Sequence, residues 1–180
     1  MARVSKTQID SWKKQYGDIL HIPFSNGKEC YLKQPDRRVL GLAYSKGARD
    51  PMAAAEVILA NCWLDGDEVI KTETGYLVTI QDMTNEIAGR VEVEIQKFAD
   101  CIKLAFEDGK KCQLKYPTRP QASEIQLAAR KDPFAMVEKA IQFCWQSGDE
   151  EIKTSIGHLL SMLQAIDELL QVKTAQVKKI

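Results

Sequence analysis

The sequence predicts an α+β fold, mainly α-helical, made of two similar units that each contain a β-hairpin followed by about three helices. The first observation is a self-alignment: at an offset of 82 residues and without a gap, 22 of the 54 positions in 24–77 match those in 106–159. The second is the order of patterns in each unit, where strand-like segments around an Asn-Gly or Asp-Gly turn precede apolar residues at helical spacing. Together these observations predict an internal duplication.

A hairpin opens each unit. Asn26-Gly27 and Asp108-Gly109 supply the positive-φ positions that a tight turn requires. Because proline cannot donate to a strand ladder, Pro35 and Pro117 are expected to end the hairpins. The expected strands are 18–24 and 29–33 in the first unit, and 100–106 and 111–115 in the second.

Three helices are expected after each hairpin. Asp36 and Thr118 are suited to cap the first of them, and the Asp-Pro pairs at 50–51 and 132–133 are suited to start the second. A turn is expected between the second and third helices, at 64–67 and again at 146–149. The expected helices are 36–46, 51–63 and 74–87 in the first unit, and 120–130, 133–145 and 155–172 in the second.

Two further segments lie outside the matched region. Helices are expected at Lys6–Tyr16, before the first unit, and at Arg90–Ala99, before the second. No Pro-, Ser- or Gly-rich linker separates the halves, and we favour two closely packed modules over two half-domains that share one core about a pseudo-twofold axis. The expected organisation is an N-terminal helix at 1–17, units at 18–89 and 90–172, and a frayed tail at 173–180.

The charge balance limits the function classes. The 25 Lys and Arg residues equal the 25 Asp and Glu residues, so the formal net charge is +0. This balance excludes the overall basicity of a dedicated nucleic-acid binder. No apolar run approaches the ~18 residues of a membrane-spanning helix, and the first residues lack the apolar segment of a signal peptide. We therefore expect no membrane contact.

The cysteines and histidines do not form a catalytic or metal-binding pattern. There are five cysteines, of which Cys30 and Cys62 recur in the second unit as Cys112 and Cys144, and no CxxC or CxxH spacing occurs. We expect them to pack in the core of a protein from a reducing compartment. His21 and His158 do not correspond to each other. The sequence thus predicts no enzyme, no metal and no cofactor.

The repeated acidic turn is the alternative starting point for catalysis or cation binding. Gly66-Asp67-Glu68 recurs as Gly148-Asp149-Glu150, but the oxygen ligands of a calcium loop are missing around it. We interpret it as a capped turn. A deep cleft that joined Cys30, Cys62 and His158 would favour an enzyme instead.

Basic residues at matching positions are the candidate partner contacts. They lie around the hairpin and its exit, and the duplicated set consists of Lys28, Lys33, Arg37, Lys110, Lys115 and Arg119. Such residues either form an anion-binding surface, including one for nucleic acid, or protect a strand edge from aggregation. The candidate structural anchors are Pro35, Cys62, Trp63, Pro117, Cys144 and Trp145.

Several short motifs resemble those of the small tail assembly chaperones of tailed phages. In the second unit they are Leu114-Lys-Tyr-Pro-Thr-Arg119, Ala129-Arg-Lys-Asp-Pro133, Cys144-Trp145 and Ser147-Gly-Asp-Glu-Glu151, followed by an amphipathic helix. The first unit carries the same pattern, so that the resemblance covers about 19–87 and 101–170. The doubling is a departure from the family's single-unit form.

The resemblance implies a non-enzymatic role. A protein of this family is expected to bind a phage structural protein, such as the tape measure or another tail protein, before assembly. Its expected location is the cytoplasm of the host cell or the assembled particle. Two related modules can engage two segments of one partner, which raises the effective concentration of the second segment. Nucleic acid, contacted by the repeated basic residues, is the alternative partner.

Overall fold

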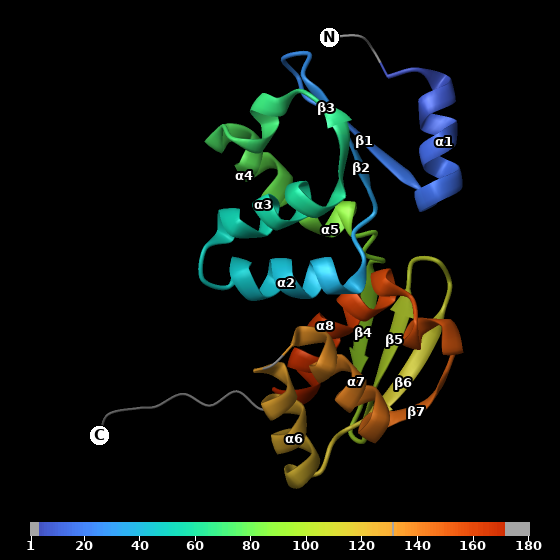
Figure 1. Cartoon of the computed structure of the whole chain (residues 1–180). Coiled ribbons are helices and arrows are strands. Elements are labelled where there is room, and N and C mark those ends of the chain that lie inside the picture. Colours follow the sequence, from blue (N-terminus) through green and yellow to red (C-terminus); the bar gives the residue numbers. More distant parts are fainter. Residues whose placement is uncertain (1–3, 131, 172–180) are drawn as a thin grey trace. The chain divides into compact units, whose positions relative to one another are not determined.

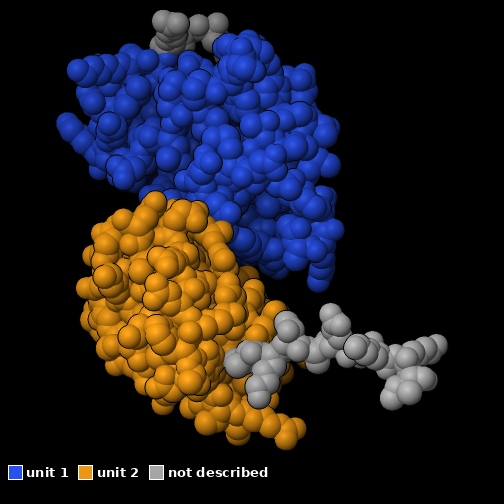
Figure 2. All heavy atoms as spheres, turned by 180° about the vertical axis from the view of Figure 1, so that it is seen from behind, with its two compact units in different colours: residues 1–89 blue, residues 90–180 orange. Residues whose placement is uncertain are grey.

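The computed structural model describes residues 4–130 and 132–171, and the chain divides between Gly89 and Arg90 into two compact units (Figures 1 and 2). Helices and two small antiparallel sheets make up both units, which confirms the predicted α+β, mainly α, class. None of the described helices combines the length and the apolar composition that crossing a bilayer requires.

Unit 1 contains a three-stranded antiparallel sheet in the order β1-β2-β3. Helices α3 and α4 lie on one side of this sheet and α1 lies on the other (Figure 1). The elements are α1 (Lys6–Tyr16), β1 (Ile19–Pro23), β2 (Glu29–Lys33), α2 (Arg37–Gly47), α3 (Pro51–Cys62), β3 (Trp63–Gly66), a 3₁₀ helix (Glu68–Lys71), α4 (Thr74–Asp82) and α5 (Thr84–Ile87).

Unit 2 contains a four-stranded antiparallel sheet in the order β4-β5-β6-β7, with its helices on one side (Figure 1). From β5 onward, each element begins 82 residues after an element of the same type in unit 1. The elements are β4 (Val93–Lys97), β5 (Cys101–Phe106), β6 (Lys111–Lys115), α6 (Arg119–Ala129), α7 (Pro133–Cys144), β7 (Trp145–Gly148), a 3₁₀ helix (Glu150–Lys153) and α8 (Ile156–Leu170).

The predicted hairpins and helix starts are confirmed. Strands β2 and β6 end two residues before Pro35 and Pro117. The carboxylate of Asp36 accepts a hydrogen bond from the N–H of Val39 at 2.8 Å and so caps α2. Asp50 and Asp132 cap α3 and α7 in the same way, with proline in the first turn of each helix.

The turn expected at 64–67 and 146–149 is wrong, because most of these residues belong to edge strands, β3 in unit 1 and β7 in unit 2. Trp63 pairs with Leu32 and Gly66 pairs with Cys30, with an irregularity in the register between them. Gly66 has a φ of +143°, and a Cβ there would lie 2.6 Å from the carbonyl oxygen of Glu29. Glycine is therefore required for the strand to approach β2 this closely.

The helix expected at Arg90–Ala99 is also wrong, because this segment contains β4. Val91, Val93 and Ile95 alternate with polar residues, and β-branched residues with a period of two favour a strand. The strand pairs antiparallel with β5, from Val93 opposite Phe106 to Lys97 opposite Ile102. The helix expected at Lys6–Tyr16 is confirmed as α1.

The third helix of unit 1 is shorter than expected. The helix predicted over 74–87 is divided at Met83 into α4 and α5. Its counterpart α8 runs without a break to Leu170. Val172 and the tail at 173–180, which were expected to extend and then fray this helix, lie outside the described residues.

The strands and helices of each unit enclose buried apolar side chains. In unit 1 the core includes Cys30, Leu32, Ile58, Cys62 and Ile80, all with no exposed surface or nearly none. In unit 2 the corresponding central positions of β6, Cys112 and Leu114, are buried in the same way. Alternation along the second hairpin strand thus places the even-numbered residues inside, as predicted.

Candidate functional site

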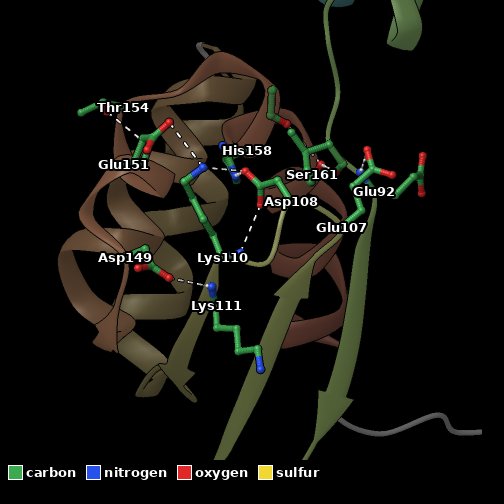
Figure 3. Close-up of polar contacts among 12 residues, drawn as sticks. Glu92, Glu107, Asp108, Lys110, Lys111, Asp149, Glu151, Thr154, His158 and Ser161 are labelled. Atoms are coloured by element: carbon green, nitrogen blue, oxygen red, sulfur yellow. Dashed lines mark hydrogen bonds and ion pairs between the residues drawn. The ribbon is translucent and has the colours of Figure 1, made fainter.

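The aspartate of the repeated Gly-Asp-Glu motif links the edge strand of each unit to the hairpin. It is Asp67, after β3, in unit 1 and Asp149, after β7, in unit 2. The carboxylate of Asp67 accepts hydrogen bonds from the N–H of Glu29 at 3.1 Å and from Nζ of Lys28 at 3.0 Å. The N–H of Asp67 in turn donates to the carbonyl of Glu29 at 3.0 Å. Asp149 makes the same two backbone contacts with Lys111, at 2.8 and 3.0 Å (Figure 3).

These contacts make the turn structural. The hydrogen bond from Lys28 lowers the pKa of Asp67, with the N–H of Glu29 acting in the same direction. A carboxylate with a lowered pKa is a weaker general base. The side chains of Asp67 and Asp149 do not cap the 3₁₀ helices that follow them, so the predicted capped turn is wrong. Each carboxylate instead links the end of its edge strand to the neighbouring strand of the hairpin.

The six repeated basic residues do not form the same open surface in both units. Lys28 pairs with Asp67, and Lys110 lies 2.6 Å from Asp108 and 3.4 Å from Glu151. Nζ of Lys33 lies 5.4 Å above the ring of Tyr16. Arg37 is half-buried at the start of α2, while Lys115 and Arg119 are exposed.

A polar cluster lies at the hairpin turn of unit 2 (Figure 3). Nε2 of His158, on α8, lies 3.1 Å from Oδ2 of Asp108, but the groups are not aligned as a hydrogen bond. The His158 ring is 2% exposed and packs edge-on against Phe106, 4.8 Å between centroids. The hydrogen bond from Lys110 lowers the pKa of Asp108 and raises that of Lys110 itself.

Unit 1 has the same arrangement with neutral side chains. Tyr76 occupies the position that corresponds to His158 and packs edge-on against Phe24, with 4.9 Å between centroids. Its hydroxyl accepts a hydrogen bond of 2.6 Å from the amide of Asn26, which corresponds to Asp108. The pair Asn26–Tyr76 in unit 1 thus corresponds to the pair Asp108–His158 in unit 2. Each pair brings the hairpin turn next to the last long helix of its unit, α4 or α8.

A tryptophan, a lysine and a glutamate form the same partly exposed group in both units. Nζ of Lys71 lies 4.1 Å from the centroid of Trp63 and 2.9 Å from Glu68. In unit 2, Lys153 lies 4.3 Å from Trp145 and 2.6 Å from Glu150. Each tryptophan begins an edge strand, β3 or β7, and both are half-buried. We call these residues the Trp63 surface and the Trp145 surface.

The sequence singled out these two tryptophans as anchors but missed their lysine and glutamate partners. Lys71 and Lys153 belong to an Ile-Lys-Thr match between the units, and Glu68 and Glu150 to the Gly-Asp-Glu match. Their recurrence at the same offset as the tryptophans was the available signal. The stacking itself depends on the 3₁₀ helix that returns each lysine to the tryptophan, which the sequence pattern did not predict.

All five cysteines are buried and have free thiols. Burial raises the pKa of Cys30 and of Cys112 to about 12, and that of Cys62 to about 11. Cys30 and Cys62 belong to unit 1 and His158 to unit 2, each within the packing of its own unit. Core packing, as predicted, accounts for the thiols.

No group of three or more possible metal ligands occurs within 4–130 and 132–171. The outer face of the sheet in unit 2 carries a shallow hollow of about 390 Å³ among Lys103, Lys111 and Gln113, but no cluster of titratable groups points to a reaction there. The Trp63 and Trp145 surfaces recur with the same residue types in both units, and we take them as the candidate functional sites. Comparison of the chain with protein-family models, curated proteins and solved structures finds no match.

Proposed function

We propose that this chain is a non-enzymatic assembly protein, similar to a tail assembly chaperone, that engages another phage structural protein through both of its units. The observation that carries the proposal is the presence of the same Trp–Lys–Glu surface on an edge strand of each unit. Tryptophan is among the residues that contribute most to binding energy at protein interfaces. A protein with two such surfaces is suited to hold a partner at two places.

The resemblance of the motifs to tail assembly chaperones supports the choice of partner, a tape measure or another tail protein. The same motifs contribute to the Trp145 surface, since Trp145 belongs to Cys144-Trp145 and Glu150 belongs to Ser147–Glu151. The location that accompanies this role is the host cytoplasm during assembly, or the particle itself.

Co-expression with candidate tail proteins, followed by affinity capture of the tagged chain, tests the proposal. We expect the wild-type chain to retain a tape measure or tail protein. Trp63→Ala and Trp145→Ala should each weaken retention, and the double variant should raise the Kd by more than about thirtyfold, as for loss of interface hot spots. Leu127→Ala is the matched control, because Leu127 is 56% exposed on α6 and belongs to neither surface.

Two results would count against the proposal. Failure of the wild-type chain to retain any phage structural protein overturns the assembly role. Retention that is equal for the wild-type chain and the Trp63→Ala/Trp145→Ala variant, both shown to be folded by circular dichroism, overturns the assignment of the surfaces.

The alternative, contact with nucleic acid through the repeated basic residues, has less support from the geometry. The ammonium groups of Lys28 and Lys110 already pair with carboxylates in their own units. If nucleic acid were the partner, its affinity would fall steeply with salt, and Lys33→Ala with Lys115→Ala would reduce that slope.

A further inference from the structure

The two units differ in what borders the first strand of the repeat. In unit 2, β4 pairs along the whole outer edge of β5. In unit 1, β1 corresponds to β5 but is itself the edge of the sheet, and no described strand pairs with its outer side. The residues that correspond to β4, Ser11–Gln15, belong to α1 instead. Unit 1 therefore has an open edge where unit 2 has a strand.

The backbone groups that face this edge can be assigned. The N–H of Phe98 donates to the carbonyl of Cys101 at 2.8 Å, so alternate residues of β5, beginning with Cys101, bond to β4. In unit 1, the N–H of Phe24 donates to the carbonyl of Lys28 at 2.8 Å, so even-numbered residues of β1 bond to β2. The backbone groups of Ile19 and His21 accordingly point to the open edge.

Unit 2 also shows how a strand reaches this position. Before β4, the N–H of Val91 donates to the carbonyl of Gly157 on α8 at 3.3 Å, and the hydroxyl of Ser161 donates to the carbonyl of Val91. Ser161 is fully buried. The chain thus crosses the first turns of α8 before it pairs with β5 (Figure 3).

The corresponding positions on α4 are present in unit 1 and uncovered. Gly75 and Thr79 stand in place of Gly157 and Ser161, and the hydroxyl of Thr79 donates to the carbonyl of Gly75 at 3.0 Å. Both residues are exposed, and Val78 on the same helix is 41% exposed. Unit 1 therefore keeps both the edge and the crossing point of an added strand.

Helix α1 does not fill this position. It contacts the outer face of the sheet, where the ring of Trp12 lies 6.0 Å from that of Tyr31 and Tyr16 lies beneath Lys33 on β2. The helix buries none of its residues. Its sequence from Ser11 to Gln15, SWKKQ, lacks the alternation of β4, so that it has no apolar face to offer as a strand.

We propose that the edge of β1 binds an extended segment of a partner protein, which adds to the sheet as an antiparallel fourth strand and crosses α4 at Gly75 and Thr79. The chemistry of the segment follows from β4: β-branched apolar residues alternating with polar ones, as in Val93-Glu-Ile-Gln-Lys97. The inference rests on the proposed binding function, but it places the segment on a different edge from the Trp63 surface.

A partner segment fits this edge better than a second copy of β1. Pro23 has no N–H and lies at the end of β1, so that any added strand lacks one ladder hydrogen bond there, whereas pairing of two β1 strands would lack one from each strand. The β4 strand of another copy already pairs with its own β5. A strand from a different protein meets only the one Pro23 of this chain and is not already paired.

A peptide with the sequence of 90–98, RVEVEIQKF, is the probe, because it carries the strand that occupies the corresponding edge in unit 2. We expect saturable binding to the full chain by fluorescence anisotropy, and no binding of a scrambled peptide. Amide hydrogen exchange measured by NMR should show new protection at Ile19 and His21, since their N–H groups would donate to the added strand.

Matched variants at His21 separate a backbone role from a side-chain role. His21→Pro removes an edge-facing N–H and should weaken peptide binding at least about tenfold. His21→Ala removes the stacking on Tyr31 and the contact with Glu29 but keeps the N–H, and should bind within about threefold of the wild-type chain. Thermal unfolding checks that both variants fold. If His21→Pro does not fold, hydrogen exchange of the wild-type chain with the peptide still tests the inference.

Several outcomes would overturn the inference. These are no saturable peptide binding, equal binding by His21→Pro, or protection that changes at Lys103 in unit 2 rather than at β1. A dimer of the free chain that His21→Pro dissociates would make a second copy the occupant. The peptide assay contains no phage protein. Its failure would overturn the inference about the β1 edge without changing the result of the capture experiments with the Trp63 and Trp145 variants.

Discussion

The carboxylate of Asp67 accepts a hydrogen bond from the backbone N–H of Glu29, which lies 38 positions earlier in the chain and 3.1 Å away. Asp149 accepts one from Lys111 in the same way, at 2.8 Å. One acid in each unit thus connects the position after the edge strand, β3 or β7, to the start of the neighbouring strand, β2 or β6. This connection gives the acid of the repeated Gly-Asp-Glu motif the same structural role in both units.

The hydrogen bonds accepted by the Asp67 carboxylate make the stability of unit 1 dependent on pH in the acid range. The pKa of Asp67 is lowered below its ordinary value of 3.8, first by the hydrogen bond from Lys28. Its stabilising contribution is therefore fully present above 3.8 and is lost as the pH falls through the lowered pKa. We expect Asp67→Asn to be less stable than the wild-type chain at pH 6, with the difference shrinking towards pH 2.

Urea unfolding at several pH values measures this difference. Asp10→Asn is the control, because Asp10 is an exposed carboxylate on α1 and the substitution changes the net charge equally. If the difference in the free energy of unfolding between Asp67→Asn and the wild-type chain stayed constant from pH 6 to pH 2, the role of the ionised carboxylate would be contradicted.

Gly66 should tolerate no side chain. A Cβ would lie 2.6 Å from the carbonyl oxygen of Glu29 and 2.7 Å from Cα of Cys30, and φ is +143°. We expect Gly66→Ala to destabilise unit 1 by more than the ~1–3 kcal/mol of backbone strain alone, because β3 must also move away from β2. Gly27→Ala, with a φ of +80° and no atom within 4 Å, should cost only the strain. Equal unfolding midpoints for the two variants would refute the close approach.

The cysteines should be unreactive in the folded chain. All five are buried, and burial raises the pKa of Cys30 to about 12 and that of Cys62 to about 11. At pH 8 a thiol with a pKa near 11 is only about one-thousandth thiolate, the form that attacks a disulfide reagent. We expect slow reaction with an aromatic disulfide reagent in buffer and reaction of five thiols in urea, followed by absorbance. Rapid modification of any thiol in buffer would show an accessible cysteine.

Asp108 and His158 should be energetically coupled, as Asn26 and Tyr76 are expected to be in unit 1. His158 is 2% exposed, and Asp108 is the charged group at 3.1 Å from its Nε2. We expect Asp108→Asn and His158→Tyr to destabilise unit 2 singly, and the double variant, which transplants the unit 1 pair, to recover ~0.5–3 kcal/mol of the summed loss. Urea unfolding of the four proteins gives the coupling, and strict additivity would exclude it.

Local sequence signals predicted much of the fold because the interactions behind them are local. Asn26-Gly27 closes a hairpin of adjacent strands, and Asp50-Pro51 caps and starts the helix that follows it. These interactions span only a few residues. The error at 90–99 had a different origin, since the alternation of Val91, Val93 and Ile95 is present in the sequence and favours the strand that forms there.

The edge strands β3 and β7 carried no such local signal. Trp63-Leu-Asp-Gly66 is short and lacks alternation, and it becomes a strand only because it meets Leu32 and Cys30 more than 30 positions away in the chain. The candidate sites share this dependence. Lys71 lies over Trp63 because the 3₁₀ helix between them turns the chain back. The open edge of β1 is recognised only by comparison with the corresponding strand β5, whose outer edge pairs with β4.

The sequence by itself determined that this protein contains two similar hairpin-and-helix units with buried cysteines, because turn residues, caps and apolar spacing act within a few residues of one another. Only the tertiary structure decided how corresponding segments are used. The segment before unit 1 became a helix on the outer face of its sheet, and the segment before unit 2 became a strand on the edge. That difference follows from pairing between strands and from packing, and it leaves β1 with an outer edge to which no described strand is paired.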